Sequence, residues 1–412
     1  MKKTASISAL LLFLTLLVEV IGTFGIIMAL PLIGEEFGLN SVELGAIVSA
    51  YFLGFALFTI PGGVAADKVG SKRIISIGLV LWALFTACTG LVTGFAMLIA
   101  VRFLLGVIQA PMSPSILKAV GERTTLEYRT TTNAVVLAAD PFGSAIAPLI
   151  VAPLIAMTGW HKTSLLLALL GLIMAPVIYF FLPRSLPAGP SPKQPAQQSD
   201  GQSSPLAMKL TDVLRNGQIW RLTLMLFGIS LVMTGFLTWV PTYLTTVKHL
   251  ELTQTGFAAS LPLLVAMLAN IAGGWLYDRF FRDKFRLMVI PALLLASLFL
   301  VLMIRSGSVV EFVLYESAIL LFLSLTSQPI MGLTMRIIPA HVLGTGSGIL
   351  LSGAKTASII TPVAMGAIIT HFSFEAGFGF LMLGLALAVV TSLGIRIKPF
   401  ESKQVHKLPP GA

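Results

Sequence analysis

Long hydrophobic stretches alternate with short polar segments along almost the whole chain. A helix that spans the hydrocarbon core of a bilayer needs roughly 20 apolar residues. Helices are favoured over strands, because an open strand would leave backbone groups unpaired in lipid. The pattern therefore predicts an all-α membrane protein with 12 transmembrane helices. The predicted spans are residues 7–33, 43–66, 74–92, 94–119, 131–158, 163–183, 218–245, 252–277, 286–304, 308–335, 344–370 and 375–396.

The alternation is interrupted over residues 184–216 by a segment rich in Pro, Gln, Ser and Gly. This composition is typical of a flexible linker, because it has nothing to bury. The segment divides six spans from six, which predicts two six-helix bundles at 1–183 and 217–398. A short basic tail follows at 399–412.

One sequence motif, which we call the repeated phrase, occurs in both halves of the chain. Gly62-Gly63-Val64-Ala65-Ala66-Asp67-Lys68 and Gly273-Gly274-Trp275-Leu276-Tyr277-Asp278-Arg279 both read Gly-Gly-x-x-x-Asp-Lys/Arg, 211 residues apart (from 67 to 278). Each phrase ends an apolar span and is followed by basic residues. A repeat of this size in an apolar chain indicates two similar halves that move against each other around a central site.

Charge is scarce and unevenly distributed. Only 11% of residues are charged, against about a quarter in soluble proteins, and 56% are hydrophobic. Lys and Arg divide 21 to 3 between the two sides of the predicted membrane, counting those at span ends with their side, and three more lie inside spans. The net charge of +10 is therefore explained by the orientation of the chain in the membrane and does not indicate a nucleic-acid partner. The positive-inside rule places the basic side, which holds both termini, in the cytoplasm.

Several sequence runs carry a resemblance to a known family. The loop Gly63 to Arg73 resembles the signature loop of the major facilitator superfamily, and three further runs narrow this to its anion:cation symporter branch, which includes sugar-acid, hexuronate and sialin-type carriers. These runs are Arg102-Phe103-Leu104-Leu105-Gly106, Phe236-Leu237-Thr238-Trp239-Val240-Pro241-Thr242-Tyr243-Leu244, and Gly348-Ile349 through Ile359-Ile360-Thr361-Pro362.

The resemblance implies the major facilitator fold and a secondary transporter that works by alternating access. The expected activity is uptake of a small organic anion, a carboxylate or sugar acid, coupled to protons. We expect no enzymatic activity, cofactor or metal. The expected location is the plasma membrane, the bacterial inner membrane, as a multi-pass monomer that contacts the lipid bilayer, its substrate and no nucleic acid.

The repeated loops predict a gate. A carboxylate at a helix end can accept hydrogen bonds from the start of a neighbouring helix, where the helix dipole is positive. Contacts of this kind can hold two bundles together in one state and release them in another. The predicted gating residues are Gly63, Asp67, Lys68, Arg73, Asp278 and Arg279.

Ionisable residues inside spans are costly, by roughly 2.5–3.5 kcal/mol each at the bilayer centre on insertion scales. The deepest are Glu19, Arg102, Asp140 and Lys355, whereas Glu316 and Lys118 lie nearer to span ends. Asp140 and Lys355 precede equivalent prolines, 214 residues apart (from 148 to 362), so the repeat places opposite charges at similar depths.

Two of these charges predict an anion site. Arg102 and Gln109 lie on one helix face, and an arginine can hold a carboxylate bidentately. We expect Arg102 and Lys355, one from each half, to hold the anion together. A structural ion pair of Arg102 with Glu19 or Asp140 is the alternative. The other predicted substrate-binding residues, which would supply stacking and hydrogen bonds, are Trp239, Tyr243, Asn270 and Gln328.

The chain departs from the resembling carriers at three places. Many of them have an Asp-Arg pair where this chain has Gly22 and Thr23, and a Glu where it has Gln109, which cannot take a proton. Many have Asn where it has Lys355. Glu19 and Asp140 are the remaining candidates for proton coupling, and sodium coupling or anion exchange stays open.

An efflux carrier, a membrane enzyme and a sensor would each need particular sequence features. The run from Gly143 to Pro148 partly resembles a drug-antiporter motif, so efflux of a drug or metabolite is an alternative. A membrane enzyme would need clustered His, Cys or carboxylates, whereas the five histidines are scattered and Cys88 is the single cysteine. A sensor would need a sizeable extramembrane domain, which the hydrophobic pattern does not predict.

Overall fold

The computed structural model describes residues 2–185, 216–281, 284–337 and 343–395, and within these residues it is helical without strands. The first half contains α1 (Lys2–Phe37), α2 (Ser41–Val69), α3 (Ser71–Thr89), α4 (Phe95–Gln109), α5 (Met112–Arg123), α6 (Leu126–Leu137) and α7 (Ala139–Phe181). The second half contains α9 (Gly217–Thr246), α10 (Leu252–Leu276), the π-helix η1 (Tyr277–Phe281), α11 (Phe285–Ile304), α12 (Val309–Ile337), α13 (Leu343–His371) and α14 (Phe374–Leu393). Most of the predicted linker 184–216 and the tail 399–412 lie outside the described residues.

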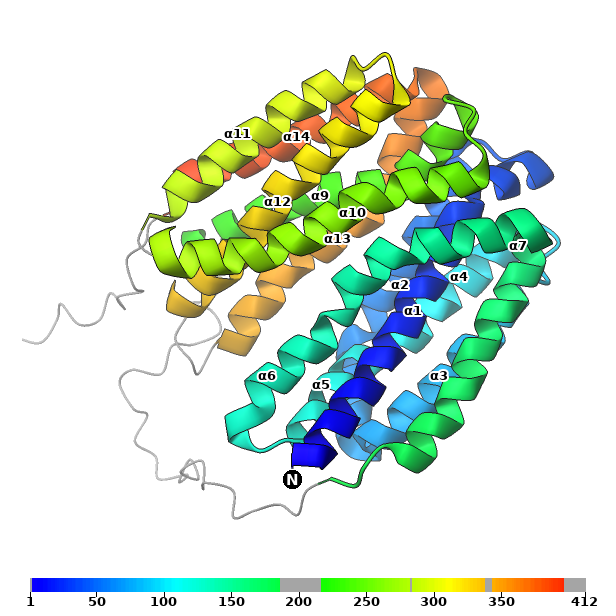
Figure 1. Cartoon of the computed structure of the whole chain (residues 1–412), viewed down its shortest axis with the longest axis vertical. Coiled ribbons are helices and arrows are strands. Elements are labelled where there is room, and N and C mark those ends of the chain that lie inside the picture. Colours follow the sequence, from blue (N-terminus) through cyan, green and yellow to red (C-terminus); the bar gives the residue numbers. More distant parts are fainter. Residues whose placement is uncertain (1, 186–215, 282–283, 338–342, 396–412) are drawn as a thin grey trace, which may run out of the picture.

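Among the described residues, eleven helical segments are long and apolar enough to cross a membrane. One of them, Thr131–Phe181, has 51 residues, more than twice the roughly 20 that a single crossing needs. Its helix α7 turns back at Gly159, whose φ of 78° lies in the left-handed region that favours glycine. Figure 1 shows the two arms of α7 on either side of this turn. The described part of the chain therefore accounts for twelve crossings, which confirms the predicted all-α fold of two six-helix bundles.

The two bundles touch most extensively along two helix pairs, α2 with α13 and α7 with α10, and α1 also contacts α9. Glycines allow close backbone approach at these crossings. A Cβ at Gly45 of α2 would collide with the backbone of Pro362 in α13, and a Cβ at Gly366 would collide with the backbone of Ser41. A Cβ at Gly256 of α10 would lie 2.6 Å from both the Pro148 carbonyl oxygen and the Ala152 Cβ of α7.

All of these contacts lie toward one end of the helices, which we call the sealed end. Figure 1 shows the bundles diverging toward the opposite end, which holds the N-terminus and which we call the open end. A Cβ at Gly63, near the open end of α2, would meet no atom within 4 Å. The molecule is therefore closed between its bundles at one end and separated at the other.

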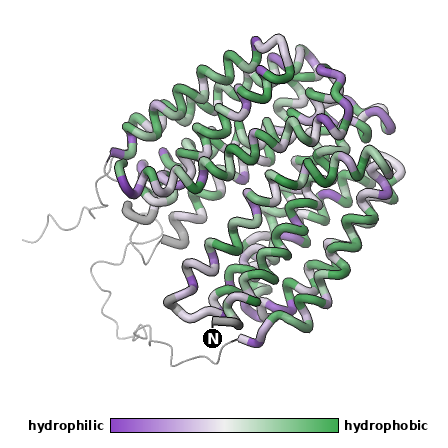
Figure 2. Tube along the Cα trace, viewed as in Figure 1, coloured by the Kyte–Doolittle hydropathy of each residue, from purple (hydrophilic) through white to green (hydrophobic). Residues whose placement is uncertain are grey.

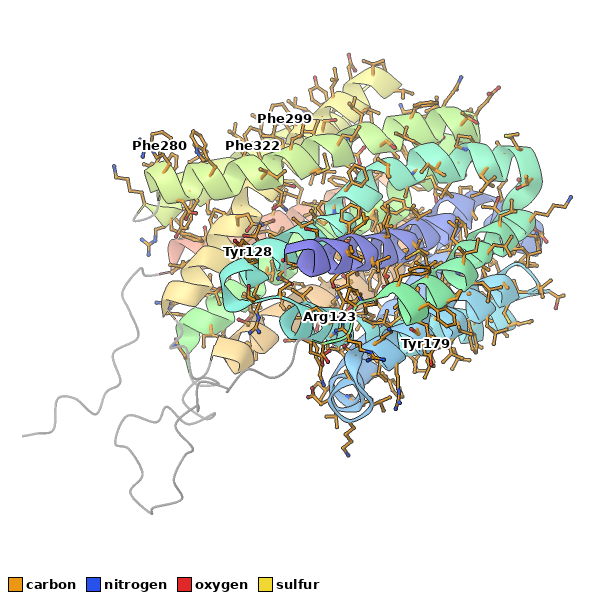
Figure 3. The ribbon with its side chains drawn as sticks, turned by 60° about the horizontal axis from the view of Figure 1, so that its bottom comes forward. Arg123, Tyr128, Tyr179, Phe280, Phe299 and Phe322 are labelled. Atoms are coloured by element: carbon orange, nitrogen blue, oxygen red, sulfur yellow. The ribbon has the colours of Figure 1, made fainter. Side chains whose placement is uncertain are left out.

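The outer surface suits a bilayer. Figure 2 shows hydrophobic residues along the lengths of the helices and hydrophilic residues gathered near their ends. Large apolar side chains are widely exposed, including Ile60 at 81%, Met157 at 83% and Phe180 at 73%. Phe299 of α11 and Phe322 of α12 stack with ring centroids 5.9 Å apart (Figure 3). Exposed apolar surface on this scale belongs in contact with lipid.

Candidate functional site

Close packing of α2 on α4 positions the centre of the candidate site. A Cβ at Gly54 would collide with the Phe103 carbonyl oxygen, and a Cβ at Gly106 would collide with that of Tyr51. Small residues at these two positions let the backbones approach each other. The crossing brings Tyr51 of α2 beside Arg102 of α4, within the first bundle.

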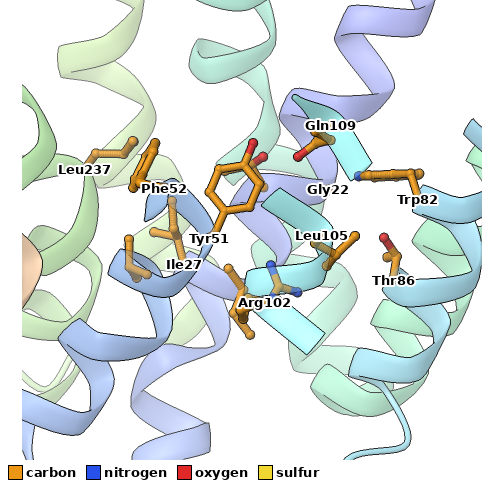
Figure 4. Close-up of a pocket in the computed structure, with 13 residues that line it drawn as sticks. Gly22, Ile27, Tyr51, Phe52, Trp82, Thr86, Arg102, Leu105, Gln109 and Leu237 are labelled. Atoms are coloured by element: carbon orange, nitrogen blue, oxygen red, sulfur yellow. The ribbon is translucent and has the colours of Figure 1, made fainter. Parts of the chain in front are cut away.

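A small cavity lies next to this crossing, and Leu237 of the second bundle forms part of its lining. Its volume is about 20 Å³, roughly the room that one water molecule needs. Figure 4 shows Arg102, Gln109, Tyr51 and Trp82 around it, with Leu237 of α9 on the far side. The other lining residues are Gly22, Thr23, Ile26, Ile27, Val48, Phe52, Thr86 and Leu105. A sugar-sized molecule would need this cavity to enlarge.

Arg102 is buried in this cavity without a carboxylate partner among the described residues. Its side chain is 6% exposed, and Nη2 donates a hydrogen bond of 3.0 Å to Thr89 Oγ1. The guanidinium Nε has no partner in the part of the chain that the structure describes. Neither Glu19 nor Asp140 lies within ion-pair distance of Arg102, so the structural ion pair weighed as an alternative is absent from this conformation of the described chain.

Gln109 and Glu19 contact each other instead. Gln109 Nε2 donates a hydrogen bond of 3.3 Å to Glu19 Oε2, which joins α4 to α1. Both residues are buried, at 3% and 7% exposure, and Glu19 Oε1 has no partner among the described residues. Two of the predicted site residues therefore lie together, with spare hydrogen-bonding capacity on the carboxyl.

Tyr51 is a site residue that the sequence reasoning missed. Its hydroxyl lies close enough to Glu19, Arg102 and Asp140 to interact with each of them electrostatically, and Figure 4 shows its ring at the centre of the lining residues. A tyrosine in the middle of a span, away from the interfacial belts where tyrosines gather, was the signal available in the sequence.

Lys355 and Asp140 also lie near each other, although they come from different bundles. They are close enough to interact electrostatically. Lys355 Nζ lies 4.5 Å from the ring centroid of Phe55, one helical turn after Tyr51 on α2. Both charged side chains are exposed to solvent. The opposite charges that the repeat places at similar depths in the two halves therefore lie near each other.

The space near Gly22 explains one departure from the resembling carriers. A Cβ at Gly22 would collide with the indole ring of Trp82. Trp82 thus occupies the room that an acidic side chain at this position would need. The coupling acid cannot stand at position 22 in this packing, whereas Glu19 lies one turn earlier and contacts Gln109.

The four remaining predicted binding residues lie apart from the Arg102 cavity. Trp239 is fully buried, and Tyr243 packs among Phe312, Phe374 and Phe378 with ring centroids 4.8, 5.6 and 5.3 Å away. Their surroundings in this conformation are those of packed core. Asn270 and Gln328 bind each other, with Gln328 Nε2 donating to Asn270 Oδ1 at 2.6 Å, in the second bundle.

The predicted gating residues lie near the open end. Asp67 Oδ1 accepts a hydrogen bond of 3.1 Å from Lys118 Nζ, and the Asp67 side chain is 78% exposed. Lys118 also donates to the Ala66 carbonyl oxygen at 3.0 Å. This pair lies within the first bundle, so Asp67 does not bridge the bundles in this conformation. The other exposed members of the set are Lys68, Arg73, Asp278 and Arg279.

The site holds hydrogen-bonding and charged groups but no cluster suited to a metal. Among the described residues, no group of three or more His, Cys, Asp or Glu side chains can hold an ion. What the arrangement offers is an unpaired guanidinium, an accessible ammonium, two carboxyls and a tyrosine hydroxyl, placed where the bundles meet.

The family model of the Major Facilitator Superfamily matches residues 12–354 of the sequence. The chain belongs to the major facilitator superfamily. The match includes most of the first bundle and much of the second, which agrees with the resemblance of the signature loop. Named proteins that are similar to this chain are transporters rather than enzymes.

Two relatives illustrate the similarity in sequence. A hexuronate transporter of Bacillus subtilis (strain 168) is 28% identical over 400 residues, covering 94% of this chain and 92% of the relative. A probable sulfoacetate transporter of Cupriavidus necator is 26% identical over 385 residues, covering 90% of this chain and 89% of the relative. Both named substrates are anions.

The fold is shared with solved structures at lower identity. A bacterial homologue of the human lysosomal transporter Spinster, in an inward-facing and unoccupied conformation, superposes with a TM-score of 0.82 at 16% identity. The superposition covers 97% of this chain and all of that chain. This similarity supports the facilitator fold.

Proposed function

We propose that this facilitator-family protein is a secondary active transporter that takes up a small organic anion of the sugar-acid class, coupled to protons. The observation that carries the proposal is the Arg102 guanidinium, 6% exposed and without a carboxylate partner among the described residues, in a cavity that the first bundle lines together with Leu237 of the second. A buried cation without a counter-ion is costly, and a substrate carboxylate would supply the missing partner.

The surrounding groups suit a polyhydroxylated acid. Arg102 can offer a second N–H through its unpartnered Nε, and Lys355 provides a cation from the other bundle. Asn270 and Gln328 offer amide groups to hydroxyls farther along the second bundle. The names of similar carriers point the same way, since they move hexuronate, L-galactonate, galactarate/D-glucarate and sulfoacetate.

The difference between the two ends of the molecule supports alternating access. The bundles meet through glycines at the sealed end and diverge at the open end. A substrate touched by Arg102 and Lys355 would draw the bundles together, because each cation belongs to a different bundle. Closure at the open end would then bring the gating loops of Asp67 and Asp278 against the opposite bundle.

Glu19 and Asp140 are the proposed coupling residues. Glu19 binds Gln109 on the face that also carries Arg102, and Asp140 lies beside Lys355. An internal carboxylate competes with the substrate for the cations, so protonation of that carboxyl would favour substrate binding.

We place both termini in the cytoplasm of a bacterial cell, so the open end is the cytoplasmic one. The basis is the 21-to-3 division of basic residues. Labelling of an introduced cysteine at Asp200, after replacing Cys88, tests this placement. The label should be accessible only in inverted vesicles, and reaction in intact cells would overturn it.

Binding to the purified protein tests the function. Titration calorimetry with D-glucuronate, D-galactonate, galactarate and sulfoacetate should detect binding of at least one of them. Arg102→Ala should weaken that binding by about 30-fold or more, equivalent to ~2 kcal/mol for lost charge-assisted hydrogen bonds. Arg102→Lys should recover only part of it, because the ammonium lacks the planar fork. The matched control is Arg305→Ala, an exposed cation outside the site.

Uptake into vesicles separates symport from anion exchange. Exchange is the second candidate because Gln109 stands where many resembling carriers have a titratable Glu. Symport predicts uptake that is stimulated by an inward proton gradient and weakened in Glu19→Gln. Exchange predicts uptake that needs internal anion and is unaffected by the gradient. Unchanged affinity in both Arg102→Ala and Lys355→Ala would contradict the proposed site.

A further inference from the structure

A second buried carboxyl lies between the bundles and takes no part in the mechanism above. Glu316 of α12 is 4% exposed, and its Oε2 has no hydrogen-bond partner among the described residues. It lines a cavity of about 20 Å³. The other lining residues are Phe24 and Met28 of α1, Phe236, Leu237, Val240 and Pro241 of α9, Ala259 and Leu263 of α10, and Leu320 of α12.

Every other lining side chain is apolar, so no titratable or charged group faces Glu316 from α1, α9 or α10 across this cavity. The helices α11 and α13, which also contact α12, contribute no residue to its lining. An ionised carboxylate in such a place would lack both water and a counter-charge, which is strongly unfavourable. While the sealed end is closed, these surroundings therefore favour the neutral form of the Glu316 carboxyl.

The lining also decides which cation fits. Metal cations of the alkali and alkaline-earth kind need several oxygen ligands, whereas Glu316 supplies the only side-chain oxygens of the lining. A proton needs a single carboxyl oxygen. The cavity is too small for more than about one water molecule, and that water would find too few polar partners.

We propose that Glu316 is a proton-binding site of the second bundle, which holds its proton while the sealed end is closed and ionises when that end opens. Phe24 and Met28 belong to the first bundle, so separation of the bundles at this end would remove one wall of the cavity and admit water. Proton binding thereby stabilises closure. The inference rests on the proposed alternating access and adds a proton site beyond Glu19 and Asp140.

The internal repeat gives independent support. Arg102 is the eighth residue of α4 and Glu316 the eighth of α12, the fourth and tenth crossings. Their offset of 214 residues, from 102 to 316, equals that of the prolines 148 and 362. Leu237 lines both the Arg102 cavity and the Glu316 cavity. The repeat therefore places a buried acid in the second bundle where the first bundle has its anion-binding arginine, with one side chain between the two cavities.

Distance measurement without substrate tests the proposal. Spin labels would be attached at Glu35→Cys and Glu251→Cys, two exposed positions at the sealed end of different bundles, in a full-length protein with Cys88→Ala. The distance between the two spin labels would be measured by double electron–electron resonance from acidic to alkaline pH. We expect the short, closed distance at acidic pH and a growing longer-distance population as pH rises. Glu316→Gln, which is neutral at every pH, should stay closed throughout.

Matched variants keep the outcome decisive. Glu311→Gln removes an exposed carboxyl from the same helix and should keep the pH response of the parent protein. Glu316→Asp retains a carboxyl and should keep a response with a shifted midpoint, which also covers the case that Glu316→Gln fails to fold. A pH response that is unchanged in Glu316→Gln, or no response in the parent protein, would overturn the proposal.

This readout is separate from the test of the proposed function. It needs no substrate, so a failure of Arg102 to bind an anion would leave the pH response of the distances intact. The converse result would be anion binding that depends on Arg102, with a pH response of the distances that is the same in Glu316→Gln as in the parent protein. That combination would support the transporter function and contradict the proton site at Glu316.

Discussion

The two ends of the bundle interface are built differently. At the sealed end, Gly45, Gly256 and Gly366 let helices of opposite bundles meet backbone to backbone. At the open end, Gly63 faces empty space, and Asp67 contacts Lys118 of its own bundle. The first kind of contact depends on shape and the second on charge. Closure at the sealed end should therefore be sensitive to a single added methyl group, and closure at the open end to charge.

The largest expected effect comes from Gly45→Val. The added side chain would collide with the Pro362 backbone, and overpacking of this kind typically costs ~1–3 kcal/mol, or about 5- to 150-fold in a conformational equilibrium. We expect the sealed end to open and transport to be nearly lost, with the fold retained. Spin-label distances across the sealed end measure the change.

Gly63→Val on the same helix is the counterpart. Its side chain meets no atom in the present conformation, so the sealed end should stay closed. If Gly63 approaches the other bundle when the open end closes, this variant should shift the equilibrium in the opposite direction from Gly45→Val. Shifts of the same sign in both variants would contradict the assignment of the two ends.

Lys355→Asn should have the next largest effect. The lysine lies over Phe55 and beside Asp140. Losing one charged contact should weaken anion binding by about tenfold, or ~1.4 kcal/mol. Divalent galactarate should lose more affinity than monovalent galactonate. Calorimetry on the two anions checks this, with equal losses counting against a direct contact.

Asp67→Asn should act mainly on the rate of exchange. The pair with Lys118 is solvent-exposed, and exposed pairs contribute ~0.2–1 kcal/mol. Stability should thus change little. We expect slower transport with nearly unchanged substrate affinity, measured by uptake kinetics beside calorimetry. Lys118→Gln is the matched variant, because it removes the same ion pair while keeping the carboxylate free to contact the other bundle.

The smallest effect is expected at a fixed contact of the sealed end. Glu36 accepts a hydrogen bond of 2.7 Å from Trp160 Nε1, and both residues belong to the first bundle. Glu36→Gln should lower the free energy of unfolding by about 1 kcal/mol or less. The distance between the bundles should not change. A changed distance would show that this contact takes part in closure.

Several features could be predicted from the sequence because they depend on local pattern. Apolar stretches of bilayer length determine the crossings, and the repeated Gly-Gly-x-x-x-Asp phrase indicates two halves. The depth of Arg102, Asp140 and Lys355 follows from their position within a span. The turn at Gly159 lies in the short break between the fifth and sixth predicted spans, so its place also follows from the pattern.

Tertiary structure alone decided which groups share a cavity. Trp82 fills the space at Gly22, and Tyr51 reaches Arg102 because Gly54 and Gly106 bring α2 against α4. Glu316 was ambiguous by position, yet apolar residues from three other helices bury it. These outcomes depend on helix rotation and on contacts between residues distant in sequence. In a chain whose spans are apolar on nearly every face, hydrophobic pattern does not specify which face of a helix turns inward.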